Sequence, residues 1–341
     1  MSARRCLVIG GTGPSGACIV ERLLARGDEV TILHTGRHEI DFCGPVEHLH
    51  GDPRELEDLQ ALIGKRQFDV AVSTSGRIRH VVSVLRGKVG RLVAISGLPY
   101  YRNSHIAPGE IGIPVPIRET DPPEDNPLHT HGFYVYRGEQ SVMAAHARGD
   151  FDATILRYTM VYGRHTYVPF EWFLVRRVLD GRRVIALEAD GLMVPQRGHA
   201  ANLAEAVMLS LEHPAARGRA YNVGDSQALS LRALTALIAE SLGHQWEMVE
   251  VPLHHSPCRN PFAMRQNTLF DLSAIRDELG YRDVIDVRTA TAEFVRWLHD
   301  HPIARGGPEE ATLGPLAFDY AAEDRVIALC RDFYVRLAHR P

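Results

Sequence analysis

The stretch CLVIGGTGPSG, residues 6–16, decides the fold. Four apolar residues run directly into a turn that has glycines at positions 10, 13 and 16. Gly10 permits a tight turn, Gly13 lets a phosphate approach the backbone, and Gly16 lets a following helix pack closely. The free N–H groups and the partial positive charge at the start of that helix favour an anion. The stretch therefore predicts a strand, a phosphate-binding turn and a helix, in that order.

Short apolar runs alternate with helical periodicities as far as residue 160. The runs are rich in Val, Ile and Leu on both faces, which is typical of parallel strands covered by helices on each side. Repeated alternation of this kind implies right-handed crossovers, and hence an α/β fold with a Rossmann-type, doubly wound parallel sheet. The predicted strands are residues 6–9, 29–33, 46–49, 69–73, 92–96 and 153–157.

Beyond the sheet, a smaller C-terminal α/β lobe is predicted to bind the substrate. The proline-rich residues 97–130 follow the fifth strand, so we expect a long loop at the ligand crevice, with a solvent-exposed decoration as the alternative. The predicted segments are 1–165 with 198–225 for the dinucleotide-binding domain, 166–197 and 226–302 for the substrate lobe, and 303–341 for a linker and a C-terminal helix.

Composition restricts the class of protein. The 341 residues are 45% hydrophobic and carry a net charge of −4, so neither nucleic acid nor an acidic membrane surface is an expected partner. Five scattered cysteines without a CxxC pair, and no signal-peptide pattern, indicate reduced thiols in the cytoplasm. No HxxxH or HExxH spacing falls on a predicted helix, so no metal site is expected; His254 and His255 beside Cys258 are a weak alternative.

The second predicted strand is followed by HTGR at residues 34–37. A site that prefers NAD usually has Asp or Glu here, which binds the ribose hydroxyls. None is present, and His34 and Arg37 are suited to a 2′-phosphate instead. The sequence favours NADP, with NAD possible; the alternative for Arg37 is a solvated surface charge.

Several further segments resemble the extended short-chain dehydrogenase/reductase superfamily, of the NAD-dependent epimerase/dehydratase type. The resemblance covers about residues 5–300 and implies a dinucleotide-dependent enzyme. The segments that carry it are the glycine turn, GD at 51–52, LRYTMVYG at 156–163, GHAANLA at 198–204, YNVG at 221–224 and FDLSAIRDELGY at 270–281.

The turn and the resemblance together indicate which residues line the cofactor. Thr12 and Ser15 can add hydroxyl donors to the turn, and the resemblance adds the ends of the third, fourth and sixth strands. The expected cofactor residues are Gly10, Thr12, Gly13, Pro14, Ser15, Gly16, His34, Arg37, Asp52, Ser73, Thr74, Ser75 and Tyr158.

The acid/base pair departs from the family pattern. The resemblance places Ser96 at the position of the catalytic Ser or Thr, beside a Tyr-x-x-x-Lys in which the lysine lowers the tyrosine pKa. This chain has no Tyr-x-x-x-Lys, and its two lysines do not fit. Alignment on Glu139 puts His131 at the tyrosine position and Val135 at the lysine position.

Three interpretations follow from this departure. His131 replaces the tyrosine, since imidazoles titrate near neutral pH. Alternatively, Tyr134 or Tyr136 enters the site with Arg137 as the cation, or the site is catalytically altered and the dinucleotide serves another purpose. The candidate catalytic residues are Ser96, His131 and Tyr134.

The expected function is that of an NAD(P)-dependent oxidoreductase with a non-standard acid/base site, which acts on a carbonyl or alcohol of a small metabolite. The alternatives are a nucleotide-sugar epimerase or dehydratase and a non-catalytic NADP sensor. Besides the small-molecule substrate, family analogy suggests a homodimer through helices near residues 77–88 and 133–147.

Overall fold

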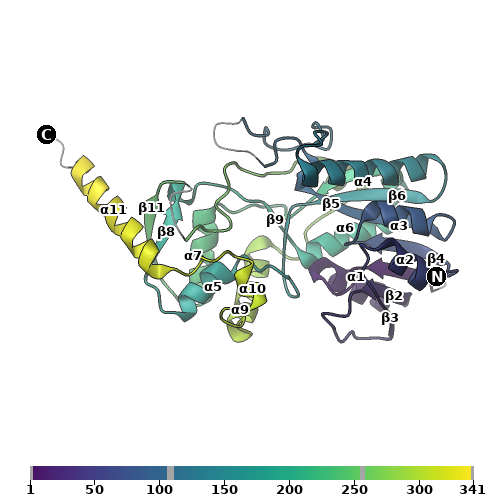
Figure 1. Ribbon diagram of the computed structural model, residues 1–341, viewed down its shortest axis with the longest axis horizontal. Coiled ribbons are helices and arrows are strands. Elements are labelled where there is room, and N and C mark those ends of the chain that lie inside the picture. The colour runs from purple at the N-terminus through teal and green to yellow at the C-terminus, as the bar shows by residue number, and fades with distance from the viewer. Residues whose placement is uncertain (1–2, 106–110, 254–257, 339–341) are drawn as a thin grey trace. The chain divides into compact units, whose positions relative to one another are not determined.

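The computed structural model describes residues 3–105, 111–253 and 258–338 (Figure 1). The chain forms two compact units. The first consists of Met1–His165, Arg197–Ser226 and Phe270–Ile285, and the second of Thr166–Gln196, Gln227–Leu269 and Asp286–Pro341. We had placed residues 270–285 in the substrate lobe. They join the first unit because Phe270 forms a bridge with Ile117 and the Tyr281 hydroxyl donates to the Gly224 carbonyl at 3.1 Å.

Within the described residues, the first unit contains a seven-stranded parallel sheet in the order β10-β6-β5-β4-β1-β2-β3. The order reverses between β1 and β4, and a ligand crevice in such a sheet lies at the carboxyl ends of those strands. The predicted doubly wound α/β class is confirmed. The strands are β1 (Arg5–Ile9), β2 (Glu29–His34), β3 (Val46–His50), β4 (Phe68–Ser73), β5 (Val89–Gly97), β6 (Asp152–Tyr158) and β10 (Arg219–Val223).

Helices cover both faces of this sheet, as the two-sided apolar strands require. Alternate residues of β1 point to opposite faces, so Val8 packs with α1 and α6 while Leu7 and Ile9 pack with α2, α3 and α4. One face carries α1 (Pro14–Ala25), α6 (Ala200–Glu212) and α8 (Ser273–Leu279), and the other carries α2 (Leu56–Ile63), α3 (Ile78–Leu85) and α4 (Thr130–Ala147).

The described part of residues 97–130 has little regular structure, as predicted, but it is anchored in the core. Tyr101 and Ile117 are fully buried, and Tyr101 forms an isolated bridge with Pro123. A short parallel pair, β7 (Met160–Tyr162) with β9 (Arg197–His199), completes the first unit and was not predicted.

The second unit pairs two parallel strands, β8 (Val184–Glu188) and β11 (Glu247–Val251), with several helices. Ser230 caps α7, since its hydroxyl accepts from the Ala233 N–H at 3.2 Å. The helices are α5 (Trp172–Leu179), α7 (Leu231–Ser241), α9 (Val287–Asp300), α10 (Pro308–Ala311) and α11 (Tyr320–Ala338).

The C-terminal helix α11, yellow in Figure 1, docks only by its first half. Val326, Ile327 and Cys330 pack against the β8–β11 pair. Phe333 and Val335, further along the same helix, are each 56% exposed.

Two further observations concern the whole described chain. Across the three described ranges, no helix combines the length and the apolarity needed to cross a bilayer. All five cysteines are free: Cys6 and Cys258 are buried, whereas Cys43 is exposed.

Candidate active site

The glycine turn has the geometry of a phosphate cradle. Gly10 has φ +89°, and its N–H donates to the Leu33 carbonyl at 2.9 Å, which ties the turn to β2. A Cβ on Gly16 would lie 2.2 Å from the Gly10 carbonyl oxygen, so only glycine allows this approach. A Cβ on Gly13 would meet nothing closer than that oxygen at 3.7 Å, which leaves open space at the N-cap of α1.

The first N–H groups of α1 remain available to an anion. The helix begins with Pro14 after the N-cap Gly13, and no described side chain caps it. Open space and uncapped amides at one helix start fit the pyrophosphate of a dinucleotide. Thr12 and Ser15 in this turn are 9% and 6% exposed.

The end of β4 lies against the same turn. The Thr74 hydroxyl lies 3.1 Å from the carbonyl oxygens of both Ile9 and Gly10, and the Ser73 hydroxyl donates to the Ser75 carbonyl at 3.0 Å. A Cβ on Gly10 would lie 2.6 Å from the Ser75 hydroxyl oxygen. The structure thus brings these three predicted residues to the glycine turn; their contact with a cofactor stays a prediction.

Two other predicted cofactor residues have structural partners. Tyr158 is 5% exposed, and its hydroxyl donates to the Leu203 carbonyl at 3.4 Å inside the core, where burial raises the pKa of the phenol. Its contact with a cofactor stays a prediction. Asp52 accepts from the Arg54 N–H at 2.9 Å, while its own N–H donates to Asp58 at 2.7 Å, so its contacts close the turn before α2.

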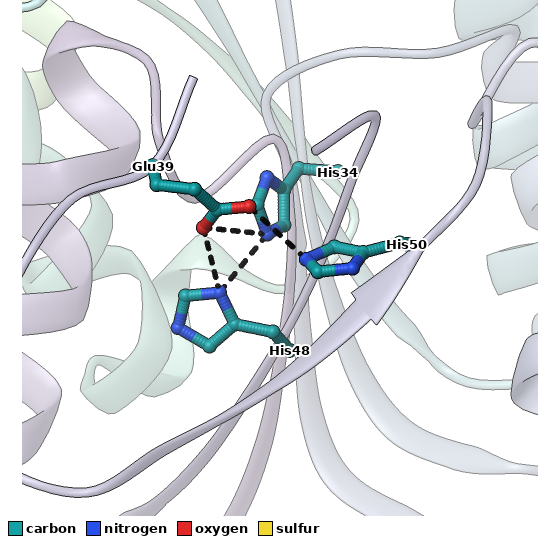
Figure 2. Close-up of side chains that lie close together, drawn as sticks. All are labelled: His34, Glu39, His48 and His50. Carbon is teal, nitrogen blue, oxygen red and sulfur yellow. Dashed lines mark hydrogen bonds and ion pairs between the residues drawn. The ribbon is translucent and has the colours of Figure 1, made fainter. Parts of the chain in front are cut away.

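His34, at the end of β2, belongs to a cluster of side chains (Figure 2). It is 4% exposed, and burial lowers the pKa of its imidazole. Its Nε2 lies 3.1 Å from Nδ1 of His48, and the Glu39 carboxylate contacts His48 and His50 at 3.2 Å. Sequence reasoning missed Glu39 because it considered only the residues directly after the strand. Arg37 is exposed.

A cavity of about 640 Å³ lies within the first unit and brings together the predicted catalytic residues. Ser96 from the end of β5 lines it together with His131 and Tyr134 from the start of α4. The Ser96 hydroxyl is buried and has no hydrogen-bond partner among the described residues. A substrate oxygen in this cavity could supply the missing partner.

One face of α4 lines the cavity, at the spacing His131, Val135, Glu139 and Val142. Residues three or four apart lie on one side of a helix, so Val135 faces the cavity beside His131. Tyr136 and Arg137, considered as alternatives, are not among the lining residues.

The positive charge at this cavity comes from a different element. Arg77 and Arg79, at the start of α3, line it. The Arg79 guanidinium lies 5.3 Å from the ring centroid of Tyr134, which is 53% exposed. A cation therefore borders the cavity even though the lysine position on α4 is apolar.

A buried ion pair anchors this face of α4 to the sheet, and sequence reasoning missed it. The Arg157 guanidinium contacts the Glu139 carboxylate at 2.7–3.2 Å, and both side chains are less than 10% exposed. Arg157 also stacks 3.4 Å from the Tyr100 ring centroid and donates to the Tyr101 hydroxyl at 2.9 Å. Arg157 belongs to the LRYTMVYG segment and Glu139 is the residue on which the acid/base pair was aligned, so a pairing of the two was the available signal.

Asp225 forms hydrogen bonds with residues of two of the motif segments, 156–163 and 198–204. Its carboxylate accepts from the Tyr162 hydroxyl and the Asn202 amide at 2.8 Å, and from the His199 N–H at 2.9 Å. Burial raises the pKa of Asp225, while burial and the nearby Arg197 charge lower the pKa of His199 to about 4. The alternative metal site at His254 and His255 lies outside the described residues.

The glycine turn and the strand order are those of a Rossmann unit, which contains a cavity lined by both polar and apolar side chains. Comparisons relate this unit to known families. Residues 100–224 match the NAD dependent epimerase/dehydratase family. Residues 100–224 therefore resemble a domain of this family, in agreement with the resemblance predicted from the sequence.

Individual relatives share about a quarter of their residues with this chain. It is 23% identical over 282 residues to the chloroplast stem-loop binding protein of 41 kDa b of Arabidopsis thaliana. The aligned residues make up 78% of this chain and 69% of the relative. This chain is 26% identical over 185 residues to a dTDP-glucose 4,6-dehydratase of Streptomyces griseus, about half of each chain.

The fold itself matches over nearly the whole chain. The crystal structure of UDP-glucose 4-epimerase from Thermotoga maritima with UDP-glucose superposes with a TM-score of 0.71 at 16% identity, over 87% of this chain and 99% of that one. This likeness supports the fold, and the substrate has to be argued from the site.

Proposed function

We propose that this protein transfers a hydride between NAD(P) and a hydroxyl- or carbonyl-bearing carbon of a nucleotide sugar. The relatives include a dTDP-glucose dehydratase and a fold neighbour determined with UDP-glucose. The observation that carries the proposal is the buried, unpartnered Ser96 hydroxyl in the cavity. Because an unsatisfied buried hydroxyl is costly, a substrate oxygen that accepts from it would be held firmly.

His131 supplies the proton transfer in this proposal. When an alcohol is oxidised, the hydride leaves the carbon and the hydroxyl proton passes to the imidazole; reduction reverses both transfers. A dinucleotide held at the glycine turn would supply the hydride acceptor or donor. Ser96 positions the substrate oxygen, and the guanidinium groups of Arg77 and Arg79 stabilise negative charge that develops near the cavity. Tyr134 is the second candidate for the acid/base group.

NADP is the proposed coenzyme. No acidic residue directly follows β2, and Arg37 is exposed at the position where a 2′-phosphate needs a donor. The nearby Glu39 carboxylate is already engaged by histidines at 3.2–3.8 Å. Fluorescence titration of the wild type and Arg37→Ala with NADPH and NADH tests this: the substitution should weaken NADPH about tenfold and leave NADH unchanged. Equal losses for both coenzymes would contradict it.

A homodimer through α3 and α4, and a cytoplasmic location, stay predictions. Sedimentation of the purified chain at micromolar concentration measures the first. A monomer throughout that range would refute it.

The test of the proposed reaction uses a panel of dTDP- and UDP-sugars with each coenzyme, and product is identified by NMR because a recycled coenzyme leaves no absorbance change. Ser96→Ala should lower kcat by about 100- to 1,000-fold. Ser83→Ala removes a serine from the exposed side of α3, outside the cavity, and should have no effect.

The histidine is tested in the same assay. His131→Asn should lower kcat by about 100- to 10,000-fold, whereas His299→Asn changes an exposed histidine on α9 and serves as its control. Unchanged turnover in both cavity variants would contradict the assignment. Coenzyme binding without turnover of any sugar would favour the non-catalytic dinucleotide-binding protein instead.

A further inference from the structure

Three histidines and one glutamate converge at the edge of the sheet, at the ends of β2 and β3 (Figure 2). We call His34, Glu39, His48 and His50 the histidine cluster. His48 and His50 lie on one face of β3 because residues two apart in a strand point the same way. His34 on β2 is the register partner of His50 in the parallel ladder, and Glu39 comes from the loop after β2.

The donor atoms are spaced as a small tetrahedral metal ion requires. All four lie within 4.8 Å of one another. Zinc bonds of about 2.0–2.1 Å in a tetrahedron separate neighbouring donors by about 3.4 Å. The cluster has separations of 3.1 Å between His34 Nε2 and His48 Nδ1, and of 3.2, 3.2 and 3.8 Å from the Glu39 oxygens to the three imidazoles.

We propose that the histidine cluster binds a single Zn²⁺ through three imidazole nitrogens and one carboxylate oxygen. The nitrogen donors are Nε2 of His34, Nδ1 of His48 and Nε2 of His50. Imidazole and carboxylate are ligands that Zn²⁺ binds readily. Four protein ligands close the coordination shell, so this is a structural site without a position for a reacting water.

A simple ion pair does not account for the arrangement. One carboxylate needs only one imidazolium, and an exposed pair of that kind contributes little to stability. Here three imidazoles surround the one carboxylate, with ring centroids 4.9–6.1 Å apart. A divalent ion would use all four groups and tie the loop at residues 36–45 to the ends of β2 and β3.

The test of this site uses no nucleotide and no sugar, so its outcome is independent of the proposed function. Full-length protein without an affinity tag is stripped with a chelator and titrated with Zn²⁺ by calorimetry, and bound metal is counted by mass spectrometry. The wild type should take up one Zn²⁺ per chain. Co²⁺ in its place should give the intense visible absorption of a tetrahedral site.

Two variants test whether Zn²⁺ binds at the histidine cluster. His50→Ala removes a donor whose side chain is 56% exposed, so the core is left intact; it should weaken Zn²⁺ binding by more than about 100-fold. His38→Ala removes an exposed histidine from the same loop, outside the ligand set, and should bind Zn²⁺ as the wild type does.

The unfolding temperature provides a second readout. Zn²⁺ should raise it in the wild type and in His38→Ala but not in His50→Ala, because a ligand that binds only the folded state stabilises that state. A wild type that binds no Zn²⁺, a weak octahedral Co²⁺ spectrum, or Zn²⁺ binding undiminished in a folded His50→Ala would each overturn the proposal.

Discussion

The glycine turn at residues 10–16 and the cavity face of α4 lie in the same Rossmann unit, but they are determined by different things. The turn is fixed by backbone: a single Cβ at Gly16 would collide with a carbonyl oxygen at 2.2 Å. The cavity face of α4 is fixed by the ion pair of Glu139 with Arg157, while His131 and Val135 on the same face line the cavity. The acid/base pair could therefore change while the helix stayed in place.

The largest expected effect on stability concerns the ion pair between Glu139 of α4 and Arg157 of β6. Glu139→Leu leaves the Arg157 guanidinium buried without its carboxylate, and should lower the free energy of unfolding by about 3–5 kcal/mol. Chemical denaturation measures it, with Gln140→Leu on the exposed side of α4 as the control. If both variants are equally stable, the ion pair does not anchor this face and the contrast with the turn fails.

Two substitutions separate the folding role of the turn from its binding role. Gly16→Ala should destabilise the protein by about 3 kcal/mol, because its Cβ meets backbone that cannot move aside. Gly13→Ala adds a Cβ in open space and should cost less than about 1 kcal/mol, yet weaken NADPH binding by about 100-fold, since the methyl group takes the place of the pyrophosphate. Denaturation and coenzyme titration measure both, and wild-type affinity in Gly13→Ala would contradict the cradle.

The partly buried imidazole of His199 should make the free energy of unfolding depend on pH. This dependence has to be separated from any effect of pH on activity. The pKa of His199 is about 4 in the folded protein, against 6.5 for a free imidazole. Between these values the unfolded chain binds a proton that the folded chain does not, so stability falls as pH drops from 6.5 to 4, by up to about 3 kcal/mol. Above pH 6.5 the contribution is constant.

His199→Gln should remove this loss. Unfolding free energies of the wild type and the variant, measured across that pH range, should therefore converge or cross as pH falls. Parallel curves would show that His199 titrates normally.

The smallest expected effect is a gain. Val135→Lys places an ammonium group on the cavity face, four residues after His131, at the position where the family pattern has lysine. One new charge-assisted hydrogen bond should tighten NADPH binding about tenfold. Gln140→Lys adds the same charge outside the cavity and should not. Equal affinities in all three proteins would mean that the coenzyme does not reach this face.

Sequence predicted the strands and the turn well because both depend on local patterns. The strand expected at 69–73 forms over Phe68–Ser73 and begins one residue earlier. The pair β7–β9 and the strand β11 escaped prediction because each short strand is defined by a partner distant in the chain.

Residues of the candidate site could be predicted only where a strand end or a helix start places them. Ser96 and His131 line one cavity, and both could be predicted because the end of the fifth strand and the start of the following helix align with the family pattern. The histidine cluster depends on the register between β2 and β3, which no single segment of sequence specifies.

The most direct measurement is calorimetry of the intact protein with the four pyridine coenzymes in turn. The account predicts saturable binding of one dinucleotide per chain, with a higher affinity for NADP or NADPH than for NAD or NADH. Absence of heat with all four coenzymes, from protein shown to be folded, would contradict the claim that the start of α1 binds a pyrophosphate.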